Sequence, residues 1–394
     1  MNAGAGAMSA GRGSMMAGAA AGGGASACVA PQCCRPLNAG GCDCVAATLD
    51  SDSDGMTDCV DPAPFGYQKR LTLDGAQVAA TLSDFPVLIR IKDAELKANA
   101  RATGADIHFA AADGTTALDY EIEAYDGQAG ALIAWVRIPT LRAGADVTLW
   151  LQYGDGKPTS TNAQRVWNGF RYVWHLAEDP SGGRSGGIKD ATARAHATAQ
   201  GNMNTMSLVP AVAGRGLAFD GTDDQLTFRN EFTGSGPCTL SAWVNQSDRN
   251  PASGGAVIAL GNASPNAARF LFSLDTDSGK VDVGFYSNDL AGPTLPTNVW
   301  THLVWTWDGT NSSIYVNGAI ATGPIAHPGA NTSGNSGRIG NSFFTSPRFL
   351  RGQLDEVRVA ASGRSSGWIE TEYENQRPDS DFVRVEPEEP RSAP

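Results

Sequence analysis

Hydrophobic and polar residues alternate along several short segments of this chain. The alternation has a period of two over about five to eight residues, which is typical of β-strands with one buried face. Asn317-Gly318 separates two further apolar segments and favours a hairpin turn, because both residues tolerate positive φ. One short helix is expected at 368–376, between Gly367 and Pro378. The alternating segments lie at 85–92, 132–138, 146–153, 240–245 and 301–307.

The composition agrees with an all-β protein. Glycine (47) and proline (21) are abundant and 18% of the 394 residues are charged, which suits many strands joined by turns. We expect two antiparallel β-sandwich domains in tandem, because the length allows two ordinary domains with tails. The expected parts are a disordered low-complexity segment at 1–27, a Cys-rich calcium-repeat-like module at 28–64, a β-sandwich at 65–170, a second sandwich at 171–385 and a disordered tail at 386–394.

The charge of the chain excludes two classes of partner. The net charge is −12, and the sequence contains no cluster of basic residues. Binding to nucleic acid or to anionic lipid depends on concentrated Lys and Arg, so neither partner is expected. No apolar run approaches the roughly 18–20 residues that a membrane-spanning helix needs. We therefore expect no transmembrane segment.

The cysteines indicate an oxidising compartment. Six of the seven lie within a short Gly- and Asp-rich segment, which is typical of a disulfide-stapled module. A zinc site is the alternative, although no Cys-x-x-Cys pair or nearby histidine supports it. Cys238 stands apart and is expected to be a small buried hydrophobe. The clustered cysteines are Cys28, Cys33, Cys34, Cys42, Cys44 and Cys59.

We therefore expect a secreted or outer-surface protein. Residues 1–27 nevertheless lack the apolar core of a signal peptide, since they contain no Leu, Ile, Val or Phe. Either export uses another route or the true start lies upstream of Met1.

A twelve-residue acidic loop carries the clearest metal-binding pattern. Aspartates occupy positions 1, 3, 5, 9 and 12, Gly55 allows a sharp turn at position 6, and the Met56 carbonyl supplies position 7. Calcium prefers to be surrounded by several oxygen ligands, as this loop would provide. The pattern resembles a thrombospondin type 3 calcium repeat; the alternative is an acidic linker that binds calcium weakly. The aspartates are Asp50, Asp52, Asp54, Asp58 and Asp61.

The second half of the chain resembles a known family over 172–384. The resemblance is to LamG-like, concanavalin A-type jelly rolls, which implies two packed antiparallel sheets, a role in adhesion or glycan recognition, and often a bound calcium. It does not imply an enzyme. The segments that carry it are Trp174-His175-Leu176, Gly216–Gly221, Thr239–Val244, Trp300–Val304, Ile314–Gly318 and Gly352–Arg358.

The preceding residues, 66–170, resemble an uncharacterised bacterial domain, domain of unknown function 2341, which commonly precedes such jelly rolls. Proteins with this domain sometimes carry a proton-channel label, which the lack of a spanning segment contradicts here. The segments that carry this resemblance are Asp84–Val87, Gly104–Phe109, Tyr120–Glu123 and Leu151–Gly154.

Asp355 is a candidate for a second calcium site. Strand alternation places it on the same face as Val357 and Val359, and a carboxylate on an apolar face needs a cation or donors. The resemblance to calcium-bearing jelly rolls adds Asp220 as a possible partner. The alternative is an aspartate at a strand end, capped by backbone N–H groups or an Arg.

A loop after Gly340 is the candidate ligand-binding surface. Exposed aromatic side chains beside amide and guanidinium donors suit recognition of carbohydrate or protein. The alternative is a loop that folds its aromatic side chains back onto the sandwich. The candidate residues are Asn341, Phe343, Phe344, Arg348 and Phe349.

Catalysis is not expected. Gly363–Gly367 matches the Gly-x-Ser-x-Gly pattern of hydrolases, but no histidine follows its serine as these enzymes require, since the last histidine is His327. Gly183–Gly187 matches too, but it lies in a loop, and a Gly- and Ser-rich chain produces such matches by chance. Glu121 and Glu123 share one strand face and could act as paired carboxylates of a glycosidase, but a polar solvent-facing strand explains them too. We expect a non-catalytic, calcium-binding extracellular or surface protein that recognises glycans or partner proteins. The alternatives are a structural or adhesive spacer and a glycoside hydrolase.

Overall fold

The computed structural model describes residues 66–155, 162–247, 254–275, 278–327, 331–344 and 346–391, together with the backbone of two N-terminal strands. The chain divides into two compact units, Met1–Ala63 and Pro64–Pro394. In the first unit β1 (Gln32–Leu37) pairs antiparallel with β2 (Gly41–Ala46). The expected disordered segment 1–27, the cysteine pairing and the calcium loop Asp50–Asp61 lie outside the described residues.

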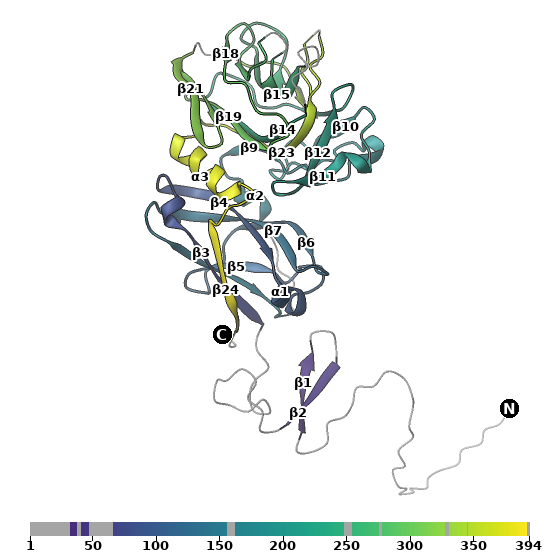
Figure 1. The fold of residues 1–394 in the computed structure, drawn as a ribbon, viewed down its shortest axis with the longest axis vertical. Coiled ribbons are helices and arrows are strands. Elements are labelled where there is room, and N and C mark those ends of the chain that lie inside the picture. The colour runs from purple at the N-terminus through teal and green to yellow at the C-terminus, as the bar shows by residue number, and fades with distance from the viewer. Residues whose placement is uncertain are drawn as a thin grey trace, which may run out of the picture. The chain divides into compact units, whose positions relative to one another are not determined.

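The second unit begins with an antiparallel sandwich of two sheets (Figure 1). Apolar residues of the two sheets, such as Leu71, Val87 and Leu149, are fully buried between them, as the alternation predicts. One sheet has the order β24-β3-β8-β5 and the other β4-β7-β6. The strands are β3 (Tyr67–Leu73), β4 (Leu82–Lys92), β5 (His108–Ala111), β6 (Tyr120–Asp126), β7 (Ala131–Leu141), β8 (Val147–Tyr153) and β24 (Val383–Pro390).

The C-terminal segment returns to this first sandwich, so the expectation of a disordered tail from residue 386 is wrong for residues 386–390. β24 forms the edge strand beside β3. An edge strand tolerates proline because its outer backbone groups face no partner strand. The register between β24 and β3 shifts between Val385 and Glu388, where Pro387 lies. Pairing with β3 therefore outweighs the polar, proline-rich composition.

The second sandwich is a jelly roll of a seven-stranded and an eight-stranded sheet. Its core contains Trp174, Leu240, Trp305 and Cys238, a free buried thiol as expected. The first sheet comprises β10 (Thr198–Gln200), β13 (Gln225–Arg229), β22 (Ser336–Ile339), β15 (Gly255–Gly261), β16 (Ala268–Leu274), β17 (Asp282–Gly284) and β18 (Asp289–Ala291). The second comprises β11 (Leu208–Ala211), β12 (Gly214–Asp220), β23 (Arg351–Ala360), β14 (Cys238–Gln246), β19 (Thr301–Trp307), β20 (Asn311–Val316) and β21 (Ala319–Ala326), with β9 (Phe170–Trp174) also paired to β23.

The helices are short, and one of them joins the two sandwiches. α3 (Ser366–Gln376) begins two residues before the expected helix, and Ser365 caps it. It lies between the sandwiches in Figure 1 and contacts β4. The sequence did not predict α1 (Ala94–Asn99) or α2 (Ala163–Val166). Among the described helices, none is long and apolar enough to span a membrane.

A single hydrophobic cluster crosses the boundary between the sandwiches. It includes Phe85 and Trp135 of the first sandwich, Val304 of the jelly roll, and Trp368 and Ile369 of α3. All of these side chains are at most 6% exposed. The two sandwiches are therefore packed against each other through a shared core rather than joined by a linker.

Candidate functional site

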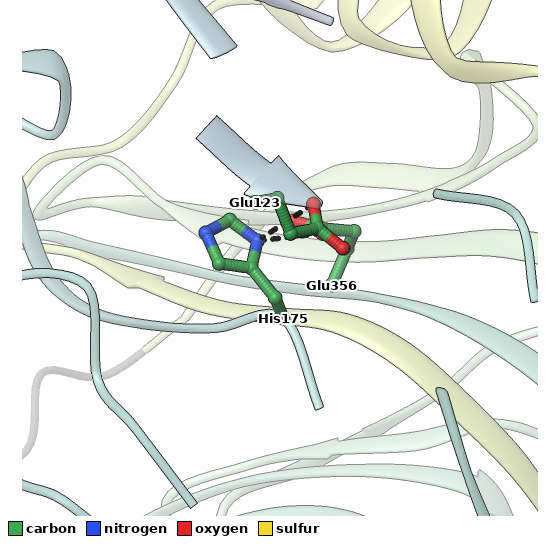
Figure 2. A group of neighbouring side chains, drawn as sticks. All are labelled: Glu123, His175 and Glu356. Carbon is green, nitrogen blue, oxygen red and sulfur yellow. Dashed lines mark hydrogen bonds and ion pairs between the residues drawn. The ribbon is translucent and has the colours of Figure 1, made fainter. Parts of the chain in front are cut away.

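A cluster of charged side chains is buried where the two sandwiches meet. We call His175, Glu121, Glu123, Glu356 and Arg358 the ionic cluster. Glu121 and Glu123 come from β6, His175 follows β9, and Glu356 and Arg358 come from β23. Figure 2 shows the imidazole of His175 pointing towards the carboxylates of Glu123 and Glu356. Residues separated by more than two hundred positions therefore share one site.

One extra residue in β23 aims two acidic side chains at this site. From Asp355 to Arg358 β23 advances three residues, while its partner β14 advances two. Glu356 lies at this β-bulge with a φ of 52°. Leu354 and Val357 on either side both belong to the jelly-roll core. The bulge therefore turns both Asp355 and Glu356 away from that core, since a regular strand would turn only one.

His175 is the centre of the ionic cluster. Its Nδ1 lies 2.7 Å from Oε1 of Glu356 and 3.5 Å from Oε2 of Glu123, and its Nε2 lies 3.4 Å from Oε2 of Glu121. Burial lowers the pKa of His175, but the negative charges of Glu356, Glu123 and Glu121 outweigh it, so the pKa is raised well above its usual value. The histidine is thus held between carboxylates on both ring nitrogens.

Aromatic and guanidinium donors fix the carboxylates. The Trp135 indole N–H donates to Oε2 of Glu123 at 2.8 Å. The Trp167 indole N–H donates in the same way to Glu121. Arg358 donates from Nε to Oε2 of Glu356 at 3.1 Å, and its guanidinium lies over both indole rings. These contacts hold each carboxylate in one orientation.

Two buried carboxylate oxygens, one in the ionic cluster and one on the neighbouring Asp355, accept no hydrogen bond within the part of the chain that the structure describes. Among the described residues, Oε1 of Glu123 and Oδ1 of Asp355 have no hydrogen-bond partner. The Glu123 side chain is 2% exposed and Asp355 is fully buried. Burial raises the pKa of Glu123 well above its usual value, and the charges of Glu356 and Asp355 act in the same direction. Burial and the charge of Glu356 likewise raise the pKa of Asp355.

A second site, on the outer face of the seven-stranded sheet, contains part of the predicted ligand-binding loop. The Phe344 ring centroid lies 5.8 Å from that of Phe270, 6.0 Å from that of Phe272 and 5.0 Å from that of Tyr286. Phe343 packs edge-on against Phe344 at 5.4 Å. We call these five residues the aromatic patch. Phe270 and Phe272 are buried beneath the loop, and the other three are half-buried.

Charged groups border the aromatic patch. Nη1 of Arg348 lies 2.5 Å from Oδ1 of Asp275, and the guanidinium lies 5.6 Å from the Phe272 ring centroid. Asp282 is paired in register opposite Phe272 on the neighbouring strand. Burial and the charges of Asp289 and Asp275 raise the pKa of Asp282 to about 7. The patch thus combines apolar ring faces with a held guanidinium and several acids.

Part of each sandwich matches the model of a known family. Residues 220–370 match the family model described as the concanavalin A-like lectin/glucanases superfamily, and residues 103–175 match domain of unknown function 2341. The match to the domain of unknown function precedes the match to the concanavalin A-like superfamily along the chain, as the sequence resemblances predict. The match to the domain of unknown function contains Glu121, Glu123 and His175, and the match to the concanavalin A-like domain contains Glu356 and Arg358. The ionic cluster therefore draws on both.

Several solved structures are similar to part of the chain. Domain 4 of the extracellular arabinanase AbnA from Geobacillus stearothermophilus, in complex with arabinotriose, is 18% identical with a TM-score of 0.41, over 52% of this chain and 97% of that one. The binding domain of paraclostridial mosquitocidal protein 1 is 12% identical (TM-score 0.38, 52% of each chain). The botulinum neurotoxin serotype D binding domain is 11% identical (TM-score 0.40, 53% and 51%). The chain spans about half the length of these two toxin domains. No curated protein matches it.

Only part of the predicted loop faces the aromatic patch of the concanavalin A-like domain. Phe343, Phe344 and Arg348 lie together, as described above. Asn341 is 1% exposed; its amide donates to Gln225 and accepts from the Arg348 backbone N–H, so it shapes the loop from beneath. Phe349 is half-buried. The loop thus follows its alternative interpretation in part, since it folds back onto the sheet.

The structure separates the two aspartates proposed to share a calcium ion. Asp220 pairs in register with Arg351, four residues before Asp355, a distance of about 13 Å along the strand. The expectation that Asp355 shares a face with Val357 and Val359 is wrong, because the bulge turns it outward. Its Oδ2 accepts the Ala213 backbone N–H at 2.7 Å.

Asp220 has other acidic neighbours instead. Ligand atoms of Asp220, Asp223 and Asp224 lie within 4.8 Å of one another. Asp224 is 3% exposed, and its Oδ1 has no hydrogen-bond partner within the described ranges. Burial raises the pKa of Asp224, and the charge of Asp220 raises it further. Oxygen-only ligands of this kind are the ones that calcium prefers.

Glu121 and Glu123 do not lie on a solvent face. Both side chains turn into the domain interface, with 16% and 2% exposure. Their partners His175 and Glu356 were not predicted, because both residues lie in segments that serve in the sequence only to mark the resemblance to the jelly-roll family. The signal in the sequence was a histidine directly after one apolar strand of that domain and two adjacent acidic residues, Asp355 and Glu356, within another.

Proposed function

We propose that this protein is a non-catalytic, calcium-binding extracellular or surface protein that binds a carbohydrate chain through the aromatic patch of its concanavalin A-like domain. The observation that carries the proposal is the half-buried ring of Phe344, which packs against Tyr286 and against Phe272, the ring over which Arg348 lies. Sugar rings present C–H faces that pack on aromatic rings, and their hydroxyl groups bond to charged side chains at the edge.

Two features of the patch support recognition of a ligand. The guanidinium of Arg348 is held by Asp275 and by the ring of Phe272, so it loses little freedom on binding. Phe270 and Phe272 support the outer rings from below. The description of the matched family includes lectins, which bind sugars, and glucanases, which cleave them. Among the described residues, the paired carboxylates Glu121 and Glu123 are buried away from the patch.

The proposal also includes bound calcium ions and a site of action outside the cell. Asp50, Asp52, Asp54, Asp58 and Asp61 would wrap one ion, with the Met56 carbonyl. Asp220 with Asp223 and Asp224 would hold a second in the concanavalin A-like domain. The clustered cysteines support a site of action outside the cell.

Depletion from solution by insoluble polysaccharides tests the proposal. The wild-type protein is mixed with each polysaccharide, with calcium or with chelator, alongside Phe344→Ala and Arg348→Ala variants. Loss of a ring or charge contact worth about 1–2 kcal/mol weakens binding roughly 5- to 30-fold. The matched control is Ile320→Ala, because Ile320 is 50% exposed on the opposite sheet.

Retention of wild type and of the control, with weak retention of both patch variants, is the expected result. Equal retention of all four proteins would place the binding surface elsewhere. No retention on any polysaccharide would favour a structural or adhesive spacer, a role that the shared core of the two sandwiches also fits.

A further inference from the structure

The ionic cluster contains more acid than its cations neutralise. The cationic side chains that interact with these acids are His175 and Arg358, together with Arg364, which interacts with Glu372, and the more distant Arg90, which interacts with Asp355. A buried carboxylate without a counter-charge is costly, so either protons or a bound cation must compensate. The acids that interact with one another or with these cations include Glu121, Glu123, Asp355, Glu356 and Glu372.

Three of these side chains converge on one point. Ligand atoms of Glu123, His175 and Glu356 lie within 4.8 Å of one another. Nδ1 of His175 is 2.7 Å from one carboxylate and 3.5 Å from the other. Ligand atoms of a tetrahedral zinc site with bonds near 2.0–2.1 Å lie about 3.3 Å apart, so the two separations bracket that spacing. The Oε1 atom of Glu123, which accepts no hydrogen bond from any described residue, is one further atom that could bind the metal.

The groups around these three side chains resemble those that orient the ligands in a metal site. A histidine that binds a metal through one nitrogen usually presents the other N–H to a carboxylate, which fixes its tautomer. Nε2 of His175 faces Glu121 at 3.4 Å, while Nδ1 faces the convergence point. The carboxylates are themselves held, Glu123 by Trp135 and Glu356 by Arg358. Such orientation of each ligand is unnecessary for a group of acids that merely share protons.

We propose that Glu123, His175 and Glu356 bind one divalent transition-metal ion of the zinc class, which bridges the two sandwiches. Imidazole nitrogen combined with carboxylate oxygen suits zinc and its neighbours, whereas calcium prefers oxygen alone. The ion takes the place of the proton on Nδ1, so uptake releases that proton. Because the three side chains are buried, the ion stabilises the interface rather than serving a reaction.

Metal analysis of the full-length protein tests this proposal. The protein is freed of metal by dialysis against chelator, loaded with zinc or cobalt(II), and dialysed again before the bound metal is measured. Glu123→Gln keeps the shape of the side chain and removes its charge. Glu121→Gln changes only the carboxylate beside Nε2 of His175, and Glu370→Gln removes an exposed carboxylate of α3 that lies outside the cluster.

We expect the wild type to retain one more ion per chain than Glu123→Gln. Loss of an outer-shell carboxylate typically weakens metal binding 10- to 100-fold, so Glu121→Gln retains zinc only at higher free concentration. Glu370→Gln behaves as wild type. The difference spectrum of the cobalt forms, wild type minus Glu123→Gln, lacks thiolate charge-transfer bands, because metal held by the N-terminal cysteines is common to both proteins.

Equal metal content in the wild type and Glu123→Gln would overturn the proposal, and so would the absence of retained zinc and cobalt from both. Zinc should also raise the unfolding temperature of the wild type and leave that of Glu123→Gln unchanged. If Glu123→Gln fails to fold, Glu121→Gln still tests the site, because a graded loss of affinity is expected only when His175 is a ligand.

Discussion

Asn375 of α3 pairs with backbone groups of the first sandwich, and its removal should destabilise the protein strongly. Its Oδ1 accepts the Leu88 backbone N–H at 2.8 Å, and its Nδ2 donates to the Leu88 carbonyl at 3.1 Å. β4 is an edge strand of its sheet, so these groups have no strand partner among the described strands. Asn375→Ala leaves one donor and one acceptor buried, at about 1–3 kcal/mol each. We expect a loss of roughly 2–5 kcal/mol in the free energy of unfolding.

Urea unfolding followed by tryptophan fluorescence and circular dichroism measures this loss. Glu370→Ala is the matched control, because Glu370 is an exposed residue of the same helix and should change stability by less than about 0.5 kcal/mol. Asn375→Asp keeps the acceptor and loses the donor, so it should also destabilise. A loss below about 1 kcal/mol for Asn375→Ala would refute the reasoning, because it would mean that water reaches Leu88 or that α3 adjusts freely.

Two titratable groups and the returning C-terminal strand give further predictions. The pKa of Asp282 is raised by burial and by Asp289 to about 7, so its ionisation opposes folding and stability falls as pH rises from about 4 to about 7. Asp282→Asn should remove that fall, about 1–3 kcal/mol at pH 8, in unfolding temperatures measured against pH; an unchanged slope contradicts it. Burial lowers the pKa of His302 to about 4, so stability is lost as pH falls from about 6.5 towards 4, and His302→Gln should flatten the acid limb of the same profile. Deletion of 383–394 exposes the edge of β3 and should cause self-association, visible by size-exclusion chromatography; a stable monomer would count against it.

The strands of the jelly roll were predictable because burial of one face imposes a period of two. The segment 301–307 became β19 with the expected bounds, and 368–376 became α3 with two extra residues. The local sequence pattern did not predict a strand whose formation depends on its pairing partner. β24 has a polar, proline-rich sequence, and it is a strand because β3 offers it an edge. Nothing within 383–390 itself contains that information.

The ionic cluster could not be predicted from the sequence for a related reason. Alternation assigns Asp355 to the core face, and only the one-residue bulge opposite β14 turns it outward beside Glu356. No local rule places such a bulge, because it depends on the register between two strands far apart in sequence. His175 reaches Glu356 through the pairing of β9 with β23, and Glu123 joins them only when the two sandwiches pack.

The way in which the ionic cluster is assembled helps to explain why its charged side chains are buried. Buried ion pairs seldom stabilise a protein more than well-packed apolar residues of similar size, whereas removal of one partner is strongly destabilising. An apolar interface would therefore serve equally well if rigidity were the only requirement, and the hydrophobic cluster around Trp368 already supplies one. A strained bulge that presents a second acid, and a histidine held between carboxylates on both nitrogens, are costs that an inert contact does not need. Their compensation by a bound cation is the simplest physical account of the interface, and the Glu123→Gln variant tests it directly.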